Sequence, residues 1–294
     1  MITYNQEDYI KDALEGVLNQ VCEFEYEVIL SNDASTDSSD ILILDFINSH
    51  PNGHRVKYFY QKKNLGMNPN LVFAYDKCIG KYVAMCEGDD FWTDPYKLQK
   101  QVDFLESNPQ FVITYHPVKI LFQDGRIERD LQFESIMERS YSTKFDLAVL
   151  GNYIHTPSVV FRKTLNSLPE TINKSPLGDF FLWMLISDKG YIKKLDYVMA
   201  VYRSGVGVFS SKDGETRVNL FRETLELLSE TLSDKVIVEI LKNKNEVMKY
   251  SYLPAPLKNL KNFSDSGNAD VIKDFVSYDQ LMKALWLKIK RKFK

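Results

Sequence analysis

Three carboxylates follow directly after an apolar, strand-like segment. The segment covers residues 81–86, and Glu87, Asp89 and Asp90 come next, on either side of a glycine. Alternate side chains of an extended backbone point the same way, so Glu87 and Asp89 face one direction and Asp90 supports them from behind. Carboxylate oxygens are the ligands that Mg²⁺ and Mn²⁺ prefer in proteins. The pattern predicts that a divalent metal and a nucleotide diphosphate bind here, and a solvated acidic turn is the alternative.

The elements that must position these acids alternate between strand and helix. Strands are predicted over residues 27–31, 56–60 and 81–86, and helices over residues 5–20, 38–49 and 68–80. Such alternation is typical of a parallel sheet covered by helices on both faces, in which ligands bind beyond the carboxyl ends of the strands. Polar residues follow three strand ends: Thr3-Tyr4-Asn5, Asn32-Asp33 and the three acids. We therefore expect these three groups to form one site.

Residues at the start of the chain and at two predicted helix starts indicate where these elements begin. Asn5 is predicted to cap the first helix, and Asn68 and Pro69 are predicted as the cap and first residue of the third. Residues 1–3 have the character of a strand end, although a first strand normally has about five residues. Either the numbering begins inside a longer natural chain or the first strand is clipped.

The composition is that of an ordinary globular protein and excludes several classes of function. Of the 294 residues, 44% are hydrophobic and 26% are charged, and the formal net charge is -3. This charge excludes a strongly basic nucleic-acid-binding protein. The three cysteines and four histidines lack metal-ligand spacing, which favours a reducing cytoplasm and cysteines that serve as small buried hydrophobes. The sequence contains neither a signal peptide nor an apolar run long enough to span a membrane.

The order and spacing of four segments resemble the family 2 glycosyltransferases of the GT-A fold. The segments are Thr3 to Gln6 with the helix to Gln20, Asn32 to Asp37, Asn64 to Gly66, and Glu87 to Trp92 followed by Asp94-Pro95. The resemblance covers about residues 1–211. It implies an α/β fold of GT-A type, with a mostly parallel central sheet flanked by helices on both faces. It also implies inverting, metal-dependent transfer of a sugar from a nucleotide diphosphate sugar, expected to be UDP-linked, to an acceptor hydroxyl.

The resemblance assigns roles to residues at the nucleotide end. It implies that Tyr4 stacks on the base, that Asp33 accepts a hydrogen bond from it, and that the acids at 87, 89 and 90 hold ribose and metal, with Mn²⁺ or Mg²⁺ expected at Asp89 and Asp90. A uracil-like base offers a flat face to a tyrosine and an imide N–H to a carboxylate. Thr3, Asn5 and Lys63 are also expected at the nucleotide, although a solvent-facing role is the alternative for Lys63.

Asp179, at the start of an apolar helix, occupies the position of the family's catalytic base. Inversion by a single displacement needs one carboxylate that takes the proton of the attacking hydroxyl, unlike the two used by most glycoside hydrolases. The family usually places another acid before it, where this chain has Gly178. Capping of the helix is the alternative role. The catalytic role requires Asp179 and the acids at 87–90 to face one cavity.

Other residues are expected on the acceptor side or over the donor. The segment 152–162 matches the family's acceptor pocket, and His155 within it is expected to contact the acceptor or a phosphate, with a structural histidine as the alternative. Trp92 is expected on the same side. Arg203, which precedes two glycines, is expected to neutralise the diphosphate in a loop that closes over the donor, or to lie in a plain exposed turn.

The chain is expected to consist of two parts. Residues 1–211 are predicted to form the glycosyltransferase domain, with a nucleotide-binding half over about 1–110 and an acceptor half over about 111–211, and residues 212–294 a helical extension. Residues 279–294 carry an apolar stripe surrounded by lysine and arginine, which is typical of a helix on an anionic membrane or of one packed on protein. Membrane contact would fit a lipid-linked or cell-surface glycan acceptor at the inner face of the membrane. A homodimer is left open.

Two other functions compete with the favoured one. A sugar-phosphate nucleotidyltransferase shares the alternating architecture, but it needs an early glycine-rich loop with a basic residue, which residues 1–20 lack. A non-catalytic relative that binds a nucleotide sugar or acts as a scaffold is consistent with the clipped first strand, with Ala34 where glycine is usual, and with Gly178. The favoured prediction is a metal-dependent inverting glycosyltransferase.

Overall fold

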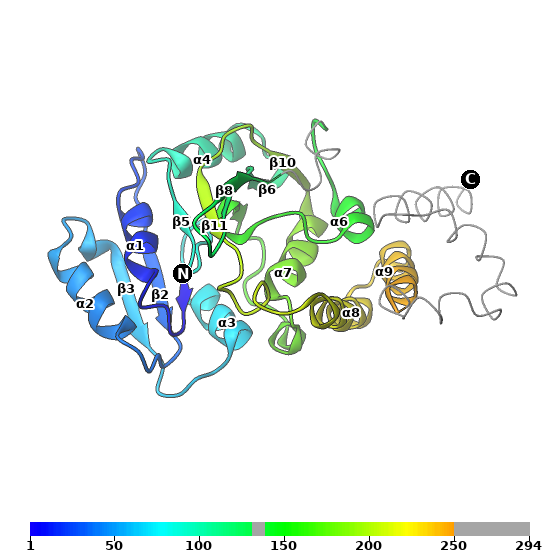
Figure 1. Cartoon of the computed structure of the whole chain (residues 1–294). Coiled ribbons are helices and arrows are strands. Elements are labelled where there is room, and N and C mark those ends of the chain that lie inside the picture. Colours follow the sequence, from blue (N-terminus) through cyan, green and yellow to red (C-terminus); the bar gives the residue numbers. More distant parts are fainter. Residues whose placement is uncertain (131–138, 250–294) are drawn as a thin grey trace, which may run out of the picture.

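The computed structural model describes residues 1–130 and 139–249, and Figure 1 shows how they are arranged. The described residues form an α/β fold with three sheets and eight α-helices. The helices are α1 (Ile10–Leu18), α2 (Ser39–Ser49), α3 (Met67–Lys77), α4 (Lys97–Ser107), α6 (Lys144–Leu150), α7 (Gly178–Ile186), α8 (Gly214–Thr231) and α9 (Lys235–Met248).

The first sheet is parallel and carries the nucleotide-end residues. It consists of β1 (Ile2–Thr3), β2 (Val28–Asn32) and β3 (Val56–Tyr60), in the order β1-β2-β3. Figure 1 shows these strands with α1 and α2 at the N-terminal side of the molecule. Ile10, Leu14, Leu30 and Ile43 are fully buried between them. The predicted bounds of β3 are confirmed, and those of β2 are confirmed within one residue.

Asn5 does not cap α1. The residue before the helix is Tyr9, and Asn5 lies earlier in a left-handed conformation with a φ of 51°. Its Oδ1 accepts a hydrogen bond from the Thr36 backbone N at 2.8 Å, and its own N donates to the Ser35 hydroxyl at 2.9 Å. The capping prediction is wrong because this side chain joins the loop after β1 to the loop after β2. Ala34, in the second loop, also has a positive φ of 59°, a conformation for which glycine is better suited.

The second sheet is mixed rather than parallel throughout. Its order is β10 (Tyr191–Lys194), β6 (Phe111–Tyr115), β9 (Val160–Arg162) and β4 (Tyr82–Ala84). β9 lies antiparallel between β6 and β4, whereas β6 and β10 are parallel. The expected α/β class is confirmed. The antiparallel insertion of β9 was not expected, because a short apolar segment has the same sequence signature in either direction.

The third sheet holds the acidic segment in place. Its order is β5 (Phe91–Trp92), β11 (Ala200–Arg203), β7 (Lys119–Leu121) and β8 (Ile127–Arg129). β5 and β11 are antiparallel, with Ala200 opposite Trp92. The acids therefore lie in the connection between β4 of one sheet and β5 of another, which restricts their backbone from both ends.

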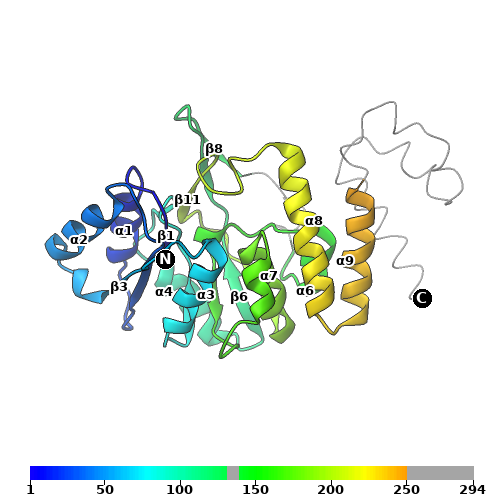
Figure 2. The same cartoon turned by 90° about the horizontal axis from the view of Figure 1, so that it is seen from below.

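The helices α8 and α9 pack on the same core as the sheets. Leu225 of α8 and Ile240 of α9 belong to one hydrophobic cluster with Phe161 of β9 and Trp183 of α7. Figure 2 shows α8 and α9 side by side, next to α7. Packing is therefore continuous across the expected boundary between residues 211 and 212.

No helix within residues 1–130 and 139–249 combines the length and the apolar character needed to cross a membrane. The tail at 279–294, for which membrane contact is predicted, lies outside the described residues. The cysteines at 22, 78 and 86 are unpaired.

Candidate active site

A cleft with a volume of about 920 Å³ opens beyond the carboxyl ends of β1 and β2. Tyr4 and Asp33 line it after these strands, Glu87 and Asp89 line it from the connection between β4 and β5, and Asp179 lines it from the start of α7. This volume lies at the upper end of the range typical of ligand-binding sites. Glu87, Asp89 and Asp179 therefore face one cavity as expected, whereas Asp90 is buried and is not among the residues that line it.

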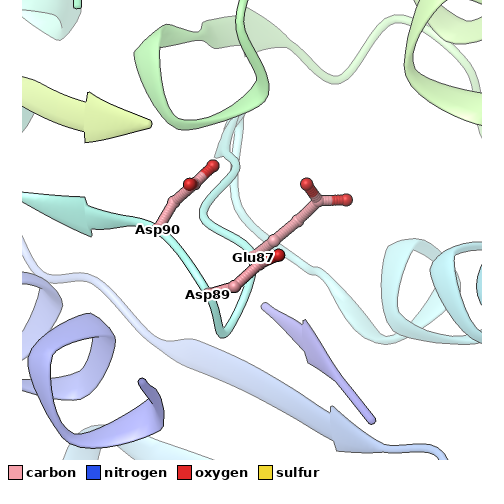
Figure 3. Close-up of side chains that lie close together, drawn as sticks. All are labelled: Glu87, Asp89 and Asp90. Atoms are coloured by element: carbon pink, nitrogen blue, oxygen red, sulfur yellow. The ribbon is translucent and has the colours of Figure 1, made fainter. Parts of the chain in front are cut away.

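The three acids of the β4–β5 connection form one cluster, shown in Figure 3. One carboxylate oxygen from each of Glu87, Asp89 and Asp90 lies within 4.8 Å of the others. Burial, followed by the charges of Asp89 and Asp179, raises the pKa of Glu87 to about 8. Burial also raises the pKa of Asp89, and with both neighbouring carboxylates it raises that of Asp90. These shifts mean that the cluster would be stabilised by a cation at its centre.

The donor set of this cluster fits a divalent metal. All three candidate ligands are carboxylates, which suit Mg²⁺ or Mn²⁺. Asp90 Oδ2 is buried and has no hydrogen-bond partner among the described residues. A buried carboxylate oxygen without a partner is costly unless a donor or cation reaches it.

Gly88 brings the acids close to the first strand. Its backbone N donates to the Ile2 carbonyl at 3.1 Å. A Cβ at this position would lie 2.4 Å from Gln6 Oε1 and 2.7 Å from the Thr3 hydroxyl oxygen, so any larger residue would displace these two side chains. The Thr3 hydroxyl in turn donates to Gln6 Oε1 at 2.7 Å. Gln6 also hydrogen-bonds the Asp89 carboxylate and lines the cleft. No role of its own was predicted for Gln6 from the sequence, although it belongs to the first segment that resembles the family.

Arg203 lies behind the acids and is not among the residues that line the cleft. Its backbone N donates to Asp90 Oδ1 at 2.8 Å. Its guanidinium donates to the Asp89 carbonyl at 2.7 Å and to an Asp12 carboxylate oxygen at 2.5 Å. The side chain is buried and fixes the backbone of the acidic segment, so its expected contact with a diphosphate is not supported by this geometry.

The expected nucleotide-end residues differ in their access to the cleft. Tyr4 is 44% exposed and lines it. Asp33 is buried, and its two carboxylate oxygens accept hydrogen bonds from the backbone N of Leu65 at 2.7 Å and of Gly66 at 2.9 Å. Each oxygen keeps a second lone pair that can accept another donor. Lys63 is exposed and does not line the cleft.

Asp179 is held by a segment remote in sequence. Asn152 Nδ2 donates to Asp179 Oδ2 at 2.8 Å, the Thr156 hydroxyl lies 3.4 Å from the same oxygen, and the Phe180 backbone N donates to Oδ1 at 2.6 Å. Burial raises the pKa of Asp179, and these hydrogen bonds oppose that shift. The sequence does not identify Asn152 or Thr156 as a partner of Asp179, because amide and hydroxyl side chains in turns commonly form local hydrogen bonds or face solvent.

Gly178 has a steric reason to lack a side chain. A Cβ there would lie 2.0 Å from Asn68 Oδ1 and 2.8 Å from Asn68 Cγ. Asn68 is buried inside α3, whose N-cap is Gly66, so the prediction that Asn68 caps this helix is wrong. An acid at this position would therefore require the buried Asn68 side chain to move.

Gly178→Ala is expected to destabilise the fold by about 1–3 kcal/mol, as overpacked core positions do. The free energy of unfolding, measured by urea denaturation, tests this. In an Asn68→Ala background the loss caused by Gly178→Ala should be smaller, because the obstructing amide is gone. Equal losses in both backgrounds would show that Asn68 is not the obstacle.

Two expected acceptor-side residues are in different environments. His155 lines the cleft, its Nε2 lies 2.7 Å from Asp130 Oδ2, and its ring centroid lies 4.8 Å from that of Tyr202. Trp92 is buried in a hydrophobic cluster, with Lys97 Nζ at 4.3 Å from its ring centroid, and does not line the cleft. The position of His155 is compatible with acceptor contact, whereas that of Trp92 does not support it.

Solved structures with this fold include proteins in complex with nucleotides or nucleotide sugars. Staphylococcus aureus TarS 1-349 in complex with UDP is 19% identical, with a TM-score of 0.61 over 91% of this chain and 77% of that one. The mannosyltransferase PcManGT of Pyrobaculum calidifontis, in complex with GDP-Man and Mn²⁺, is 16% identical, with a TM-score of 0.58 over 99% of this chain and 84% of that one. At these identities the likeness shows the GT-A type of fold alone.

Sequence comparison identifies the family. An uncharacterized protein of Mycobacterium tuberculosis is 36% identical over 234 residues, which are 77% of this chain and 66% of that protein, so the chain spans slightly less than two thirds of this relative. TuaG of Bacillus subtilis, whose provisional name assigns it to teichuronic acid biosynthesis as a glycosyltransferase, is 25% identical over 64% of this chain and 71% of its own length. The family model of glycosyl transferase family 2 matches residues 1–168. The chain therefore belongs to glycosyl transferase family 2.

Proposed function

We propose that this protein transfers a sugar, with inversion and with a divalent metal, from a UDP-linked donor to an acceptor hydroxyl. The observation that carries the proposal is the single cleft lined by Glu87, Asp89 and Asp179. A single displacement needs a site that stabilises the leaving diphosphate and a base that takes the proton of the attacking hydroxyl. The acidic cluster and Asp179 supply these two parts.

Each part of the reaction has a residue suited to it. Asp179 takes the acceptor proton, and its pKa, raised by burial, makes it a stronger base than a solvated aspartate. Asn152 and Thr156 keep its carboxylate oriented. Asp89 and Asp90 would hold the metal, which when bound neutralises charge on the diphosphate. Arg203 keeps the backbone beneath these ligands in place.

The choice of UDP rests on the nucleotide end of the cleft. A uracil ring has a flat face for Tyr4 and an imide N–H for the free lone pairs of Asp33. TarS structures contain UDP and UDP-GlcNAc, and PcManGT contains GDP-Man with Mn²⁺. These complexes support a nucleotide sugar donor and leave the base to be decided by experiment.

Tyr4→Ala is expected to weaken UDP binding by about 1–3 kcal/mol, the size of base stacking on an aromatic ring. Titration calorimetry with UDP and Mn²⁺ measures this. The effect should appear mainly in the affinity and less in kcat, and Tyr4→Phe should retain binding. Tyr96→Ala, at an exposed tyrosine outside the cleft, serves as the control. If Tyr4→Ala bound UDP with the same affinity as the wild type, Tyr4 would not be the residue that stacks on the base.

We further propose that the acceptor is a cell-surface or lipid-linked glycan at the inner face of the membrane. The provisional name of TuaG supports a cell-surface polymer. Within this proposal, residues 1–110 form the donor half and residues 111–211 the acceptor half. Membrane contact through residues 279–294 and a homodimer both stay predictions.

A panel of nucleotide sugars tests the proposal. A donor present at 100 times its dissociation constant should stabilise the purified protein by about 2.7 kcal/mol in thermal unfolding. The same donor should then release its nucleotide diphosphate slowly in Mn²⁺ and not in EDTA. Stabilisation without any release, with or without candidate acceptors, would favour the non-catalytic relative instead.

A further inference from the structure

An apolar wall adjoins the reaction site in the cleft. We use this name for the cleft-lining residues Leu150, Pro176, Leu177, Val218, Phe221 and Met248. They come from the ends of α6 and α9, from the segment before α7, and from α8. Figure 2 places α8 beyond α3 and α7, on the side away from β1 to β3, so this wall lies away from the proposed nucleotide end.

The wall is a fixed surface. Gly214, Arg217, Val218 and Phe221 all line the cleft, and their i, i+3, i+4, i+7 spacing places them on one face of α8. The Phe221 ring stacks on Phe180 with 5.2 Å between centroids. A Cβ on Gly151 would lie 3.1 Å from Phe221 Cζ, so the neighbouring backbone approaches the ring closely. The surface is therefore held from behind by the core.

Arg217 is the only lysine or arginine among the described residues that line the cleft. It is exposed, and within residues 1–130 and 139–249 its side chain makes no hydrogen bond or ion pair. The cleft otherwise carries five carboxylates, at positions 33, 87, 89, 130 and 179. Each of these acids already has a partner or a proposed role. Asp33 accepts hydrogen bonds from two loop amides, and Asp130 pairs with His155. The other three are the acids of the proposed metal cluster and the proposed base. The charge of Arg217 is left for a ligand.

The chemistry of this surface differs from that of a sugar-binding surface. A sugar ring needs several hydrogen-bonding groups, because buried hydroxyls are costly when unpaired. The side chains of the apolar wall offer none, and Arg217 beside them offers one cation. An apolar group that carries a negative charge matches both features.

We propose that the acceptor is an amphiphile whose apolar part lies along the apolar wall and whose phosphate pairs with Arg217, so that its hydroxyl reaches Asp179. This inference rests on the proposed function and adds the position and chemistry of the acceptor subsite. The apolar wall supplies contact area, and the guanidinium supplies selection for the anion, since arginine binds phosphate through two parallel hydrogen bonds.

Binding of simple probes, without any donor, tests the inference. Decyl phosphate below its critical micelle concentration, decanol and inorganic phosphate are titrated into the protein and followed by NMR. Decyl phosphate should bind about tenfold or more tightly than either other probe, the ratio expected for hydrogen bonds to a charged group. The inorganic phosphate titration separates a lipid phosphate from a free phosphate, and binding of free phosphate as tight as that of decyl phosphate would overturn the inference.

Variants separate the two parts of the subsite. Arg217→Ala should weaken decyl phosphate about tenfold and leave decanol unchanged, because only the charged contact is lost. Val218→Ser should weaken both alkyl probes. Arg126→Ala, at an exposed arginine of the β7–β8 hairpin outside the cleft, is the matched control and should change neither.

A parallel titration with UDP and Mn²⁺ distinguishes failure of this inference from failure of the proposed function. Arg217→Ala should leave UDP affinity unchanged. If that variant weakens UDP and not decyl phosphate, Arg217 serves the donor and the inference is overturned while the function stands. Decyl phosphate binding that is unchanged in Arg217→Ala and Val218→Ser would also overturn it. Absence of UDP binding by the wild type would instead count against the proposed function.

Discussion

Asp179→Asn is expected to lower kcat for sugar transfer by about 100-fold or more, because positioned general bases contribute about 10²–10⁴-fold. Asparagine keeps the shape of the side chain and can still pair with Asn152 after rotation of its amide, but it cannot take a proton. Initial rates at saturating donor and acceptor measure the effect. UDP binding, measured by calorimetry, should be unchanged, because the proposed base site is not part of the nucleotide site.

The control for this prediction is Asp196→Asn. Asp196 is exposed and pairs only with Lys194 among the interactions of the described residues, outside the cleft. Its substitution should leave both kcat and UDP affinity unchanged. An Asp179→Asn variant that kept more than about a tenth of the wild-type rate, a barrier change under about 1.4 kcal/mol, would contradict the assignment of the base.

Asp89→Asn is expected to lower kcat/KM by about 100-fold or more, since charge stabilisation by a bound metal contributes several kcal/mol. The physical reason is the loss of one anionic ligand from a cluster whose three oxygens lie within 4.8 Å. Mn²⁺ affinity, measured by electron paramagnetic resonance, should fall in parallel. The fold should survive, because Arg203 bonds the Asp89 carbonyl, which the substitution retains.

Asp76→Asn, at an exposed aspartate of α3 outside the cleft, is the matched control for the metal prediction. It should leave Mn²⁺ affinity and rate at wild-type values. Asp89→Asn with unchanged Mn²⁺ affinity would exclude Asp89 as a ligand. Full activity of the wild type in EDTA would exclude the metal from the reaction altogether.

Strong local patterns made much of the fold predictable from the sequence. The alternation of apolar and turn residues predicted the bounds of β3 and predicted those of β2 within one residue. The reason is that short runs of β-branched and aromatic residues between turns are typical of strands. The position of Asn5 could not be predicted in this way. Its cap signal is local, but its actual partners, Ser35 and Thr36, come from another loop. The antiparallel β9 was unpredictable for a similar reason, since pairing direction depends on the whole sheet.

The candidate site was predictable where side-chain chemistry is unusual. Three neighbouring acids after a predicted strand drew attention to residues 87–90, and the family resemblance drew attention to Asp179; the structure brings Glu87, Asp89 and Asp179 to one cleft. The contacts of Arg203 could not be predicted, because an arginine near glycines resembles an anion site in sequence, whereas its guanidinium donates to the Asp89 carbonyl and to the Asp12 carboxylate. Asn152 gives no such signal, since its role depends on a contact across 27 positions in the chain.

The central claim is that one donor sugar binds between the acidic cluster and Asp179, and that both take part in its transfer. A crystal structure with Mn²⁺ and an unreactive UDP-sugar analogue tests it most directly. The account predicts an anomalous peak at Asp89 and a sugar whose anomeric carbon faces the Asp179 side of the cleft. A metal bound away from Asp89, or a sugar ring directed away from Asp179, would contradict it.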